Sequence, residues 1–208
     1  MIAICIGHSR KIGGRYDGGA YSQHLKISER DFNLKVATKL SAELTRKGIP
    51  SKIFDHYAGN GYGYAMSDIA DKVKAVQATL AIELHFNSAT PSATGHEWLY
   101  WHSSVKGKAI AEKFNDCFSK NFPNIKARGI KAIKKTDRGG KFLELTHCPA
   151  IIVEPFFGSN EGDCKQVNPD NIAETYANAI NLCVNQSGHK PFEIEVGRDR
   201  YISPTGIL

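Results

Sequence analysis

The sequence predicts an α/β domain, and two observations support this. Short apolar runs alternate with stretches whose apolar residues recur at helical spacing, which is typical of strands and helices that alternate along a chain. The chain has 208 residues, 41% hydrophobic and 23% charged, which is enough for one full hydrophobic core and ordinary for a globular protein. We expect one domain over residues 1–186 and a short appendage over residues 187–208 that packs on it.

The strands follow from the apolar runs. They are expected at residues 2–6, 49–54, 79–86, 97–101 and 150–154, with weaker ones near 129–134 and 141–145. In the appendage, residues 192–196 alternate like a short strand.

The helices follow from spacing and from their end signals. Ser28, with Asp31 three residues later, predicts a capping box that opens a helix, and Lys47-Gly48 ends it. Helical spacing recurs over residues 66–76 and 110–118. Pro169 fits the first turn of a last helix.

Charge and cysteine content limit the class of partner. A formal net charge of +6 suits a polyanion such as nucleic acid, an anionic membrane surface or a bacterial wall with acidic polymers. No run of five like charges marks a nucleic-acid arm, and we expect no nucleic-acid partner. Five widely spaced cysteines without a C-x-x-C pair predict reduced thiols, not a disulfide framework or a cysteine-built zinc site. We expect a monomer.

Residues 1–8 lack the basic region and the apolar length of a secretory signal. No apolar run approaches the roughly 20 residues that cross a bilayer. We therefore expect synthesis in a cytoplasm, without a signal peptide and without membrane insertion.

Two histidines stand at the ends of predicted strands. His8 directly follows the first strand, and His85 lies near the end of the strand over residues 79–86. In open α/β sheets, ligands bind at the carboxyl ends of the strands, so these two imidazoles can converge on one point. Each alone is more typical of a partly buried structural histidine.

Glu29 lies in the first turn of the helix that Ser28 opens. Alone it is typical of an acidic residue favoured there by the helix dipole. Together with His8 and His85, however, it completes the two-histidine, one-glutamate ligand set of catalytic zinc sites, which leave a fourth position for water. Bound zinc lowers the pKa of that water to about 7.

Glu154 closes the apolar strand over residues 150–154. A carboxylate in that place either points into a site, reaches solvent, or costs several kcal/mol to bury without a partner. A zinc-water hydrolase also needs a base that takes a proton from water and hands it to the leaving amine. We favour Glu154 for that role.

The residues just described stand within a pattern that resembles the zinc-dependent N-acetylmuramoyl-L-alanine amidases of bacterial autolysins and phage endolysins, over nearly the whole of residues 1–186. The matching pieces occur in the family's order. They are Gly7-His8, Asp17-Gly18-Gly19-Ala20, Glu29 with Asn33-Leu34, the stretch from Glu83 to Asn87, Gly95-His96-Glu97, and the stretch from Pro149 through Glu154 and Phe157 to Ser159-Asn160.

The resemblance implies a fold, a ligand set and a reaction. The fold would be a single α/β domain with a mixed, mainly parallel six-stranded sheet flanked by helices. His8, Glu29 and His85 would hold one zinc ion, and Glu154 would be the catalytic carboxylate. The enzyme would cut the amide bond between N-acetylmuramic acid and the L-alanine of the stem peptide. It would act on the cell wall after release, as a phage or prophage endolysin or as a bacterial autolysin.

The sequence departs from the family pattern at two places. Glu83 stands where the family usually has a small serine, and it shares a strand face with His85. It can orient a ligand, tune the metal, contact substrate, or only face a polar neighbour. The loop after His8 is also unusually basic, and Arg15 in it can meet an acidic wall or stem peptide. Asn87, which ends the element around His85, is a further substrate or metal-shell candidate.

Two other functions stay open at this point. A metallopeptidase or deacylase of similar architecture would use the same ligands on another amide substrate. A non-catalytic wall-binding or nucleic-acid-binding protein would have no need of Glu154.

Overall fold

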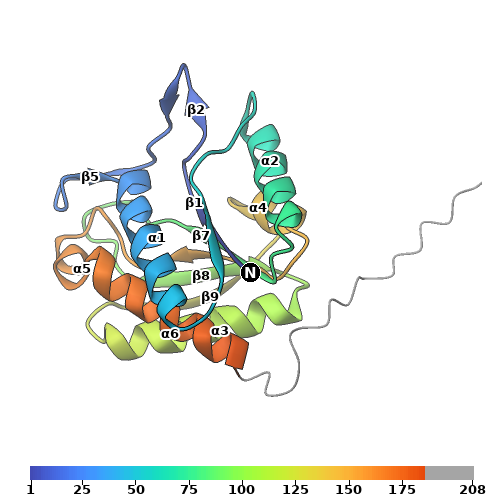
Figure 1. Cartoon of the computed structure of the whole chain (residues 1–208). Helices are drawn as coiled ribbons and strands as arrows, with labels where there is room; N and C mark the ends of the chain where they lie inside the picture. The colour runs from blue at the N-terminus through green and yellow to red at the C-terminus, as the bar shows by residue number, and fades with distance from the viewer. Residues whose placement is uncertain (186–208) are drawn as a thin grey trace, which may run out of the picture.

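A computed structural model describes residues 1–185 and places six strands in one sheet (Figure 1). The strand order is β6-β1-β7-β10-β8-β9, and only the β10–β8 pair is antiparallel. The expected mixed, mainly parallel six-stranded sheet is therefore confirmed. The strands are β1 (Ile2–Ile6), β6 (Ser51–Phe54), β7 (Leu80–Leu84), β8 (His96–Trp101), β9 (Ala127–Ile133) and β10 (Ala150–Glu154).

Helices cover both faces of the sheet (Figure 1). One face carries α1 (Glu29–Arg46), α3 (Val105–Asn121) and α6 (Pro169–Asn185), and the other carries α2 (Tyr62–Ala75) and α4 (Gly140–Leu145). A short helix, α5 (Glu161–Gln166), precedes α6. No described helix is long and apolar enough to cross a membrane.

The burial of β1 explains why its sequence is apolar throughout. Ile2, Ile4 and Ile6 join the core beneath α1, α3 and α6. Ala3 and Cys5 join the smaller core beneath α2 and α4. A strand buried on both faces has no polar side, because successive side chains point to opposite faces.

The start of α1 forms as predicted. Ser28 caps it, and its hydroxyl oxygen accepts a hydrogen bond from the Asp31 N–H at 3.2 Å. The helix ends at Arg46, followed by Lys47 and by Gly48 in the left-handed region at φ 70°. Glu29 is thus the first residue of a helix that has a defined cap at its start and a glycine just after its end.

The predicted weak strand at 141–145 is wrong, because these residues form α4. Phe142 and Leu143 are neighbours in sequence and are both buried against the core that contains α2. A strand would turn them to opposite faces, whereas a helix can present both to one neighbour. The strand predicted near 129–134 is confirmed as β9, which begins earlier, at Ala127.

Two short ribbons follow β1. The first pairs β2 (Lys11–Ile12) with β3 (Arg15–Tyr16) through Gly13-Gly14, and both glycines have positive φ, as a two-residue hairpin turn requires. The second pairs β4 (Tyr21–Ser22) with β5 (Ile27–Ser28) and leads into α1. The appendage over 187–208 and its predicted strand lie outside the described residues.

Candidate active site

The structure brings the three predicted metal ligands together at one edge of the sheet. β1 and β7 are parallel neighbours, so His8 and His85, which follow them, lie at adjacent strand ends. Glu29 reaches the same place from the first turn of α1. One candidate ligand atom from each residue lies within 4.8 Å of the others.

Glu29 lies between the two imidazoles. Its Oε2 is 3.3 Å from His8 Nε2, and its Oε1 is 2.8 Å from His85 Nδ1. The backbone N–H groups of Ala20 and Phe86 also donate to this carboxylate, at 3.1 and 3.2 Å. Burial alone would raise the pKa of Glu29, but the two adjacent histidines outweigh it and hold that pKa well below its ordinary value. Glu29 is therefore ionised at neutral pH.

The backbone and one more side chain orient His8. Its φ of 59° lies in the left-handed region, an uncommon conformation for a side chain other than glycine. Its Nδ1 faces the Asp17 carboxylate at 3.4 Å. Its Nε2 is buried, has no hydrogen-bond partner and faces Glu29. The free nitrogen therefore points into the cluster.

Two glycines make room for the rings. A Cβ on Gly7 would lie 2.2 Å from a carbon of the His85 ring. A Cβ on Gly19 would lie 2.6 Å from His8 and 2.7 Å from Glu29 Oε2. Both glycines belong to the motifs singled out in the sequence, where this reason for them could not be seen.

These observations fit a divalent metal ion. Two imidazole nitrogens and one ionised carboxylate are a donor set that zinc uses, and the unpartnered Nε2 of His8 is a ready ligand atom. The three residues can thus hold a metal.

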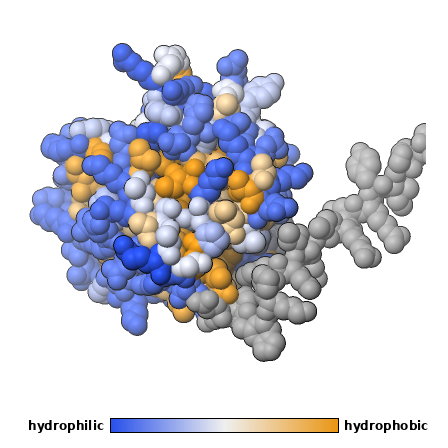
Figure 2. Space-filling view, in the orientation of Figure 1, coloured by the Kyte–Doolittle hydropathy of each residue, from blue (hydrophilic) through white to orange (hydrophobic). Residues whose placement is uncertain are grey.

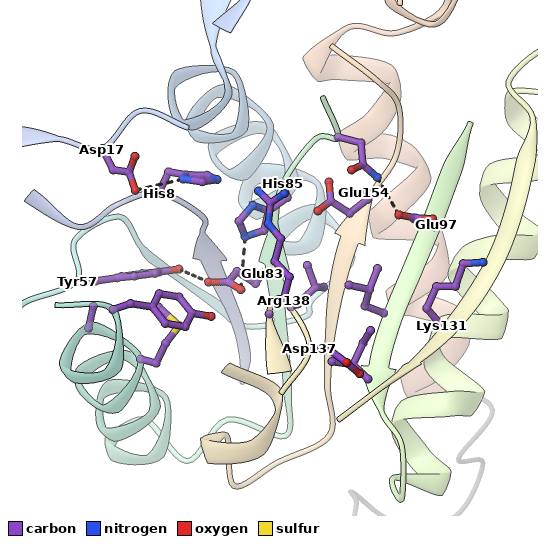
Figure 3. Close-up of a pocket in the computed structure, with 18 of the residues that line it drawn as sticks. His8, Asp17, Tyr57, Glu83, His85, Glu97, Lys131, Asp137, Arg138 and Glu154 are labelled. Carbon is purple, nitrogen blue, oxygen red and sulfur yellow. Dashed lines mark hydrogen bonds and ion pairs between the residues drawn. The ribbon is translucent and has the colours of Figure 1, made fainter. Parts of the chain in front are cut away.

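Glu154 ends β10 and lines the same cleft as His8 and His85 (Figure 3). Its Oε2 is buried without a hydrogen-bond partner. Burial raises the pKa of Glu154 to about 7, with the nearby Glu29 adding to the rise and His85 opposing it. A carboxyl group with such a pKa can accept and return a proton near neutral pH.

The cleft has a volume of about 590 Å³. Its lining includes Tyr62 and Met66 of α2, Lys131 of β9, and Arg138 just before α4. Figure 2 shows the face seen in Figure 1 as largely hydrophilic, with hydrophobic side chains gathered in its middle. Met66, Leu99 and Ile152 give the cleft apolar walls, and Lys131 and Arg138 add charged groups. Lys131 and Arg138 were not singled out from the sequence, because nothing along the chain places them beside the histidines.

The three further candidates lie in different settings. Glu83 is buried next to His85, at 3.4 Å between Oε2 and Nε2. Asn87 lines the cleft, and its amide donates to Glu97 at 2.9 Å. Arg15 lies on the exposed β2–β3 hairpin and is not among the residues that line the cleft.

Comparison with known proteins places these features in context. The family described as N-acetylmuramoyl-L-alanine amidase matches residues 2–186. A Bacillus subtilis relative named uncharacterized protein YqiI is 25% identical over 187 residues, covering 86% of this chain and 80% of its own length.

Several solved structures share the fold. An N-acetylmuramoyl-L-alanine amidase from Clostridium difficile 630 superposes with a TM-score of 0.70 at 24% identity, covering 86% of this chain and 93% of its own. The catalytic domain of CD27L, an endolysin that targets Clostridia difficile, superposes with a TM-score of 0.71 at 23% identity, covering 88% and 96%.

Proposed function

The chain belongs to the N-acetylmuramoyl-L-alanine amidase family, and from that premise we propose which of its residues hydrolyse the amide bond in peptidoglycan. Membership selects an amidase over the peptidase, deacylase and non-catalytic alternatives. The observation that carries the assignment of residues is the meeting of His8, Glu29 and His85, within 4.8 Å, in the cleft that Glu154 also lines.

We propose that His8, Glu29 and His85 hold one zinc ion. The donor set, the unpartnered nitrogen of His8 and the two glycines that admit the rings support this. Zinc in such a set supplies a water of lowered pKa and stabilises the negative charge that develops on the carbonyl oxygen. Asp17, at 3.4 Å from His8 Nδ1, keeps the other ring nitrogen directed at the metal position.

Glu154 is the general base and then the general acid in this proposal. The attacking water must lose a proton, and the leaving L-alanine nitrogen must gain one. One carboxyl group can do both if its pKa lies near the working pH. Burial raises the pKa of Glu154 to about 7, which suits the role.

The lytic context is also a proposal. With peptidoglycan as substrate, the chain would serve as a phage or prophage endolysin or as a bacterial autolysin that acts on the wall after release. The net charge of +6 would help it hold an anionic wall.

The test compares the wild-type protein with Glu154→Gln on purified peptidoglycan. New N-terminal L-alanine reports cleavage of the proposed bond, and bound zinc is measured on the same samples. We expect wild-type protein to release L-alanine termini. A chelator should stop this release, and added zinc should restore it. Glu154→Gln should keep its zinc and lose at least about 100-fold in rate, since general acid–base catalysis contributes about that much.

Two outcomes would count against the proposal. Full activity of Glu154→Gln would remove Glu154 from the mechanism. Wall cleavage without new L-alanine termini would mean that another bond is cut.

A further inference from the structure

Glu83 is a carboxylate in an apolar strand. It lies in β7, whose five residues are all buried, and it is itself 4% exposed. Burying a carboxylate is costly unless charged or hydrogen-bonding partners compensate. The groups that contact Glu83 therefore indicate its role.

Glu83 has two partners among the described residues, one for each oxygen (Figure 3). Oε2 lies 3.4 Å from His85 Nε2, and Oε1 accepts a hydrogen bond from the Tyr57 hydroxyl at 3.3 Å. Tyr57 is 2% exposed and Glu83 is 4% exposed, so their hydrogen bond is largely buried in the wall of the cleft.

The two nitrogens of His85 face different carboxylates. Nδ1 faces Glu29 at 2.8 Å, within the cluster of candidate metal ligands, and Nε2 faces Glu83. Among the described residues, the group whose ligand atoms all lie within 4.8 Å of one another is His8, Glu29 and His85, without Glu83. Glu83 thus lies behind the imidazole, on the side away from the metal position.

We propose that Glu83 is a positioning residue of the metal site, an inference that rests on the proposed role of His85 as a ligand. Glu83 accepts the hydrogen bond of His85 Nε2–H, which leaves Nδ1 without a proton and free to bind the metal. Tyr57 donates to the other oxygen and holds the carboxylate in place. A histidine that binds a metal through one nitrogen commonly donates the other N–H to a carboxylate in this way, which fixes the ring and makes it a stronger ligand.

Charge supports the same arrangement. A dication held by one carboxylate and two neutral imidazoles keeps a net positive charge in a buried place. Glu83 adds negative charge one imidazole ring away from the metal position beside His85, as Asp17 does beside His8.

The experiment measures zinc dissociation constants by competition with a chromogenic chelator, for the full chain and its variants. Glu83→Ala removes acceptor and charge, Glu83→Gln keeps an acceptor without the charge, and Tyr57→Phe removes only the supporting hydroxyl. We expect the dissociation constant to rise about 10- to 100-fold in Glu83→Ala, less in Glu83→Gln, and least in Tyr57→Phe.

A matched control is Glu97→Gln. Glu97 lines the same cleft but pairs with Asn87 and Arg128 instead of His85. Its zinc dissociation constant should stay within about twofold of wild type, since the change lies outside the ligand group. Circular dichroism of each metal-free variant checks the fold, and Glu83→Gln, the closest match in shape, serves if Glu83→Ala does not fold.

A second readout is the position of the proton on His85. Long-range nitrogen–proton NMR of ¹⁵N-histidine-labelled, zinc-loaded protein distinguishes a protonated nitrogen from a metal-bound one, and His85→Ala assigns the signal. We expect a proton on Nε2 and the metal on Nδ1. A role confined to packing would leave both the tautomer and the zinc affinity insensitive to Glu83.

The outcomes separate the two proposals. If wild-type protein binds no zinc, or if His85→Ala does not weaken binding, the proposed metal site fails. If binding depends on His85 but is unchanged in Glu83→Ala and Glu83→Gln, or if His85 binds through Nε2, only the role of Glu83 is overturned.

Discussion

A carboxyl group that exchanges protons at neutral pH needs a pKa above its ordinary value, and burial raises the pKa of Glu154 in this way. The pKa rises from 4.5 to about 7, so the folded chain holds this proton more tightly than the unfolded chain does. The stabilisation of the folded state by the proton on Glu154 is therefore complete below about pH 4.5 and is lost as the pH rises through 7. At about 1.4 kcal/mol per pKa unit, the loss is about 3 kcal/mol.

Glu154→Gln should lack this pH dependence. We expect the free energy of unfolding of Glu154→Gln minus that of wild type, measured by urea unfolding of metal-free protein, to rise by about 3 kcal/mol from pH 4.5 to pH 8. A difference between the two proteins that does not change with pH would show that Glu154 titrates normally.

Substitution of Gly7 tests how closely the His85 ring packs against the backbone. The methyl group in Gly7→Ala would lie 2.2 Å from the His85 ring, so the ring must move. Overpacking of this kind costs about 1–3 kcal/mol, which corresponds to roughly 5- to 150-fold weaker zinc binding if the strain falls on the bound state.

The control is Gly162→Ala, in α5, where the added Cβ meets only the side-chain oxygen of Asn160 at 3.1 Å. It should bind zinc like wild type. Equal zinc affinities for Gly7→Ala and wild type would mean that the His85 ring can move aside without weakening the binding of zinc.

Among the elements, α1 matters most for the site, because its cap precedes a proposed ligand directly. Ser28→Ala should lower the free energy of unfolding by about 1 kcal/mol through loss of the cap. It should also weaken zinc binding, because Glu29 is the first residue of the helix.

Ser104 provides the comparison. It caps α3 in the same way, accepting from the Gly107 N–H at 2.9 Å, but α3 supplies none of the proposed ligands. Ser104→Ala should cost similar stability and leave the zinc affinity unchanged. If the two variants bind zinc equally well, the cap of α1 does not position Glu29.

Some elements could be predicted from sequence and others could not, for physical reasons. β1, β7 and β10 are buried among other strands and helices, so each is mostly apolar, with Glu83 and Glu154 as the exceptions. β9 lies at the edge of the sheet and is largely exposed, so its pattern is weak. α4 has six residues, too few to show a helical period, and was predicted as a strand.

At the scale of the molecule, the site depends on contacts between distant parts of the chain. The meeting of His8, Glu29 and His85 could be predicted because strand ends and a helix start share one edge of the sheet. Glu83 could also be named as a candidate, because it shares a strand face with His85. Two other groups of the site could not be predicted. Tyr57 reaches Glu83 from a loop, and Arg138 reaches the cleft from the turn before α4, and neither stands in a sequence pattern that points to the histidines.

The most direct test of the account is the amount of zinc bound by purified protein after dialysis, measured by elemental analysis. Wild-type protein and Glu154→Gln should hold about one zinc ion per chain. His8→Ala, Glu29→Ala and His85→Ala should each hold almost none while keeping their folded circular dichroism spectrum. One zinc ion per chain in all three ligand variants, or none in folded wild-type protein supplied with zinc, would contradict the account.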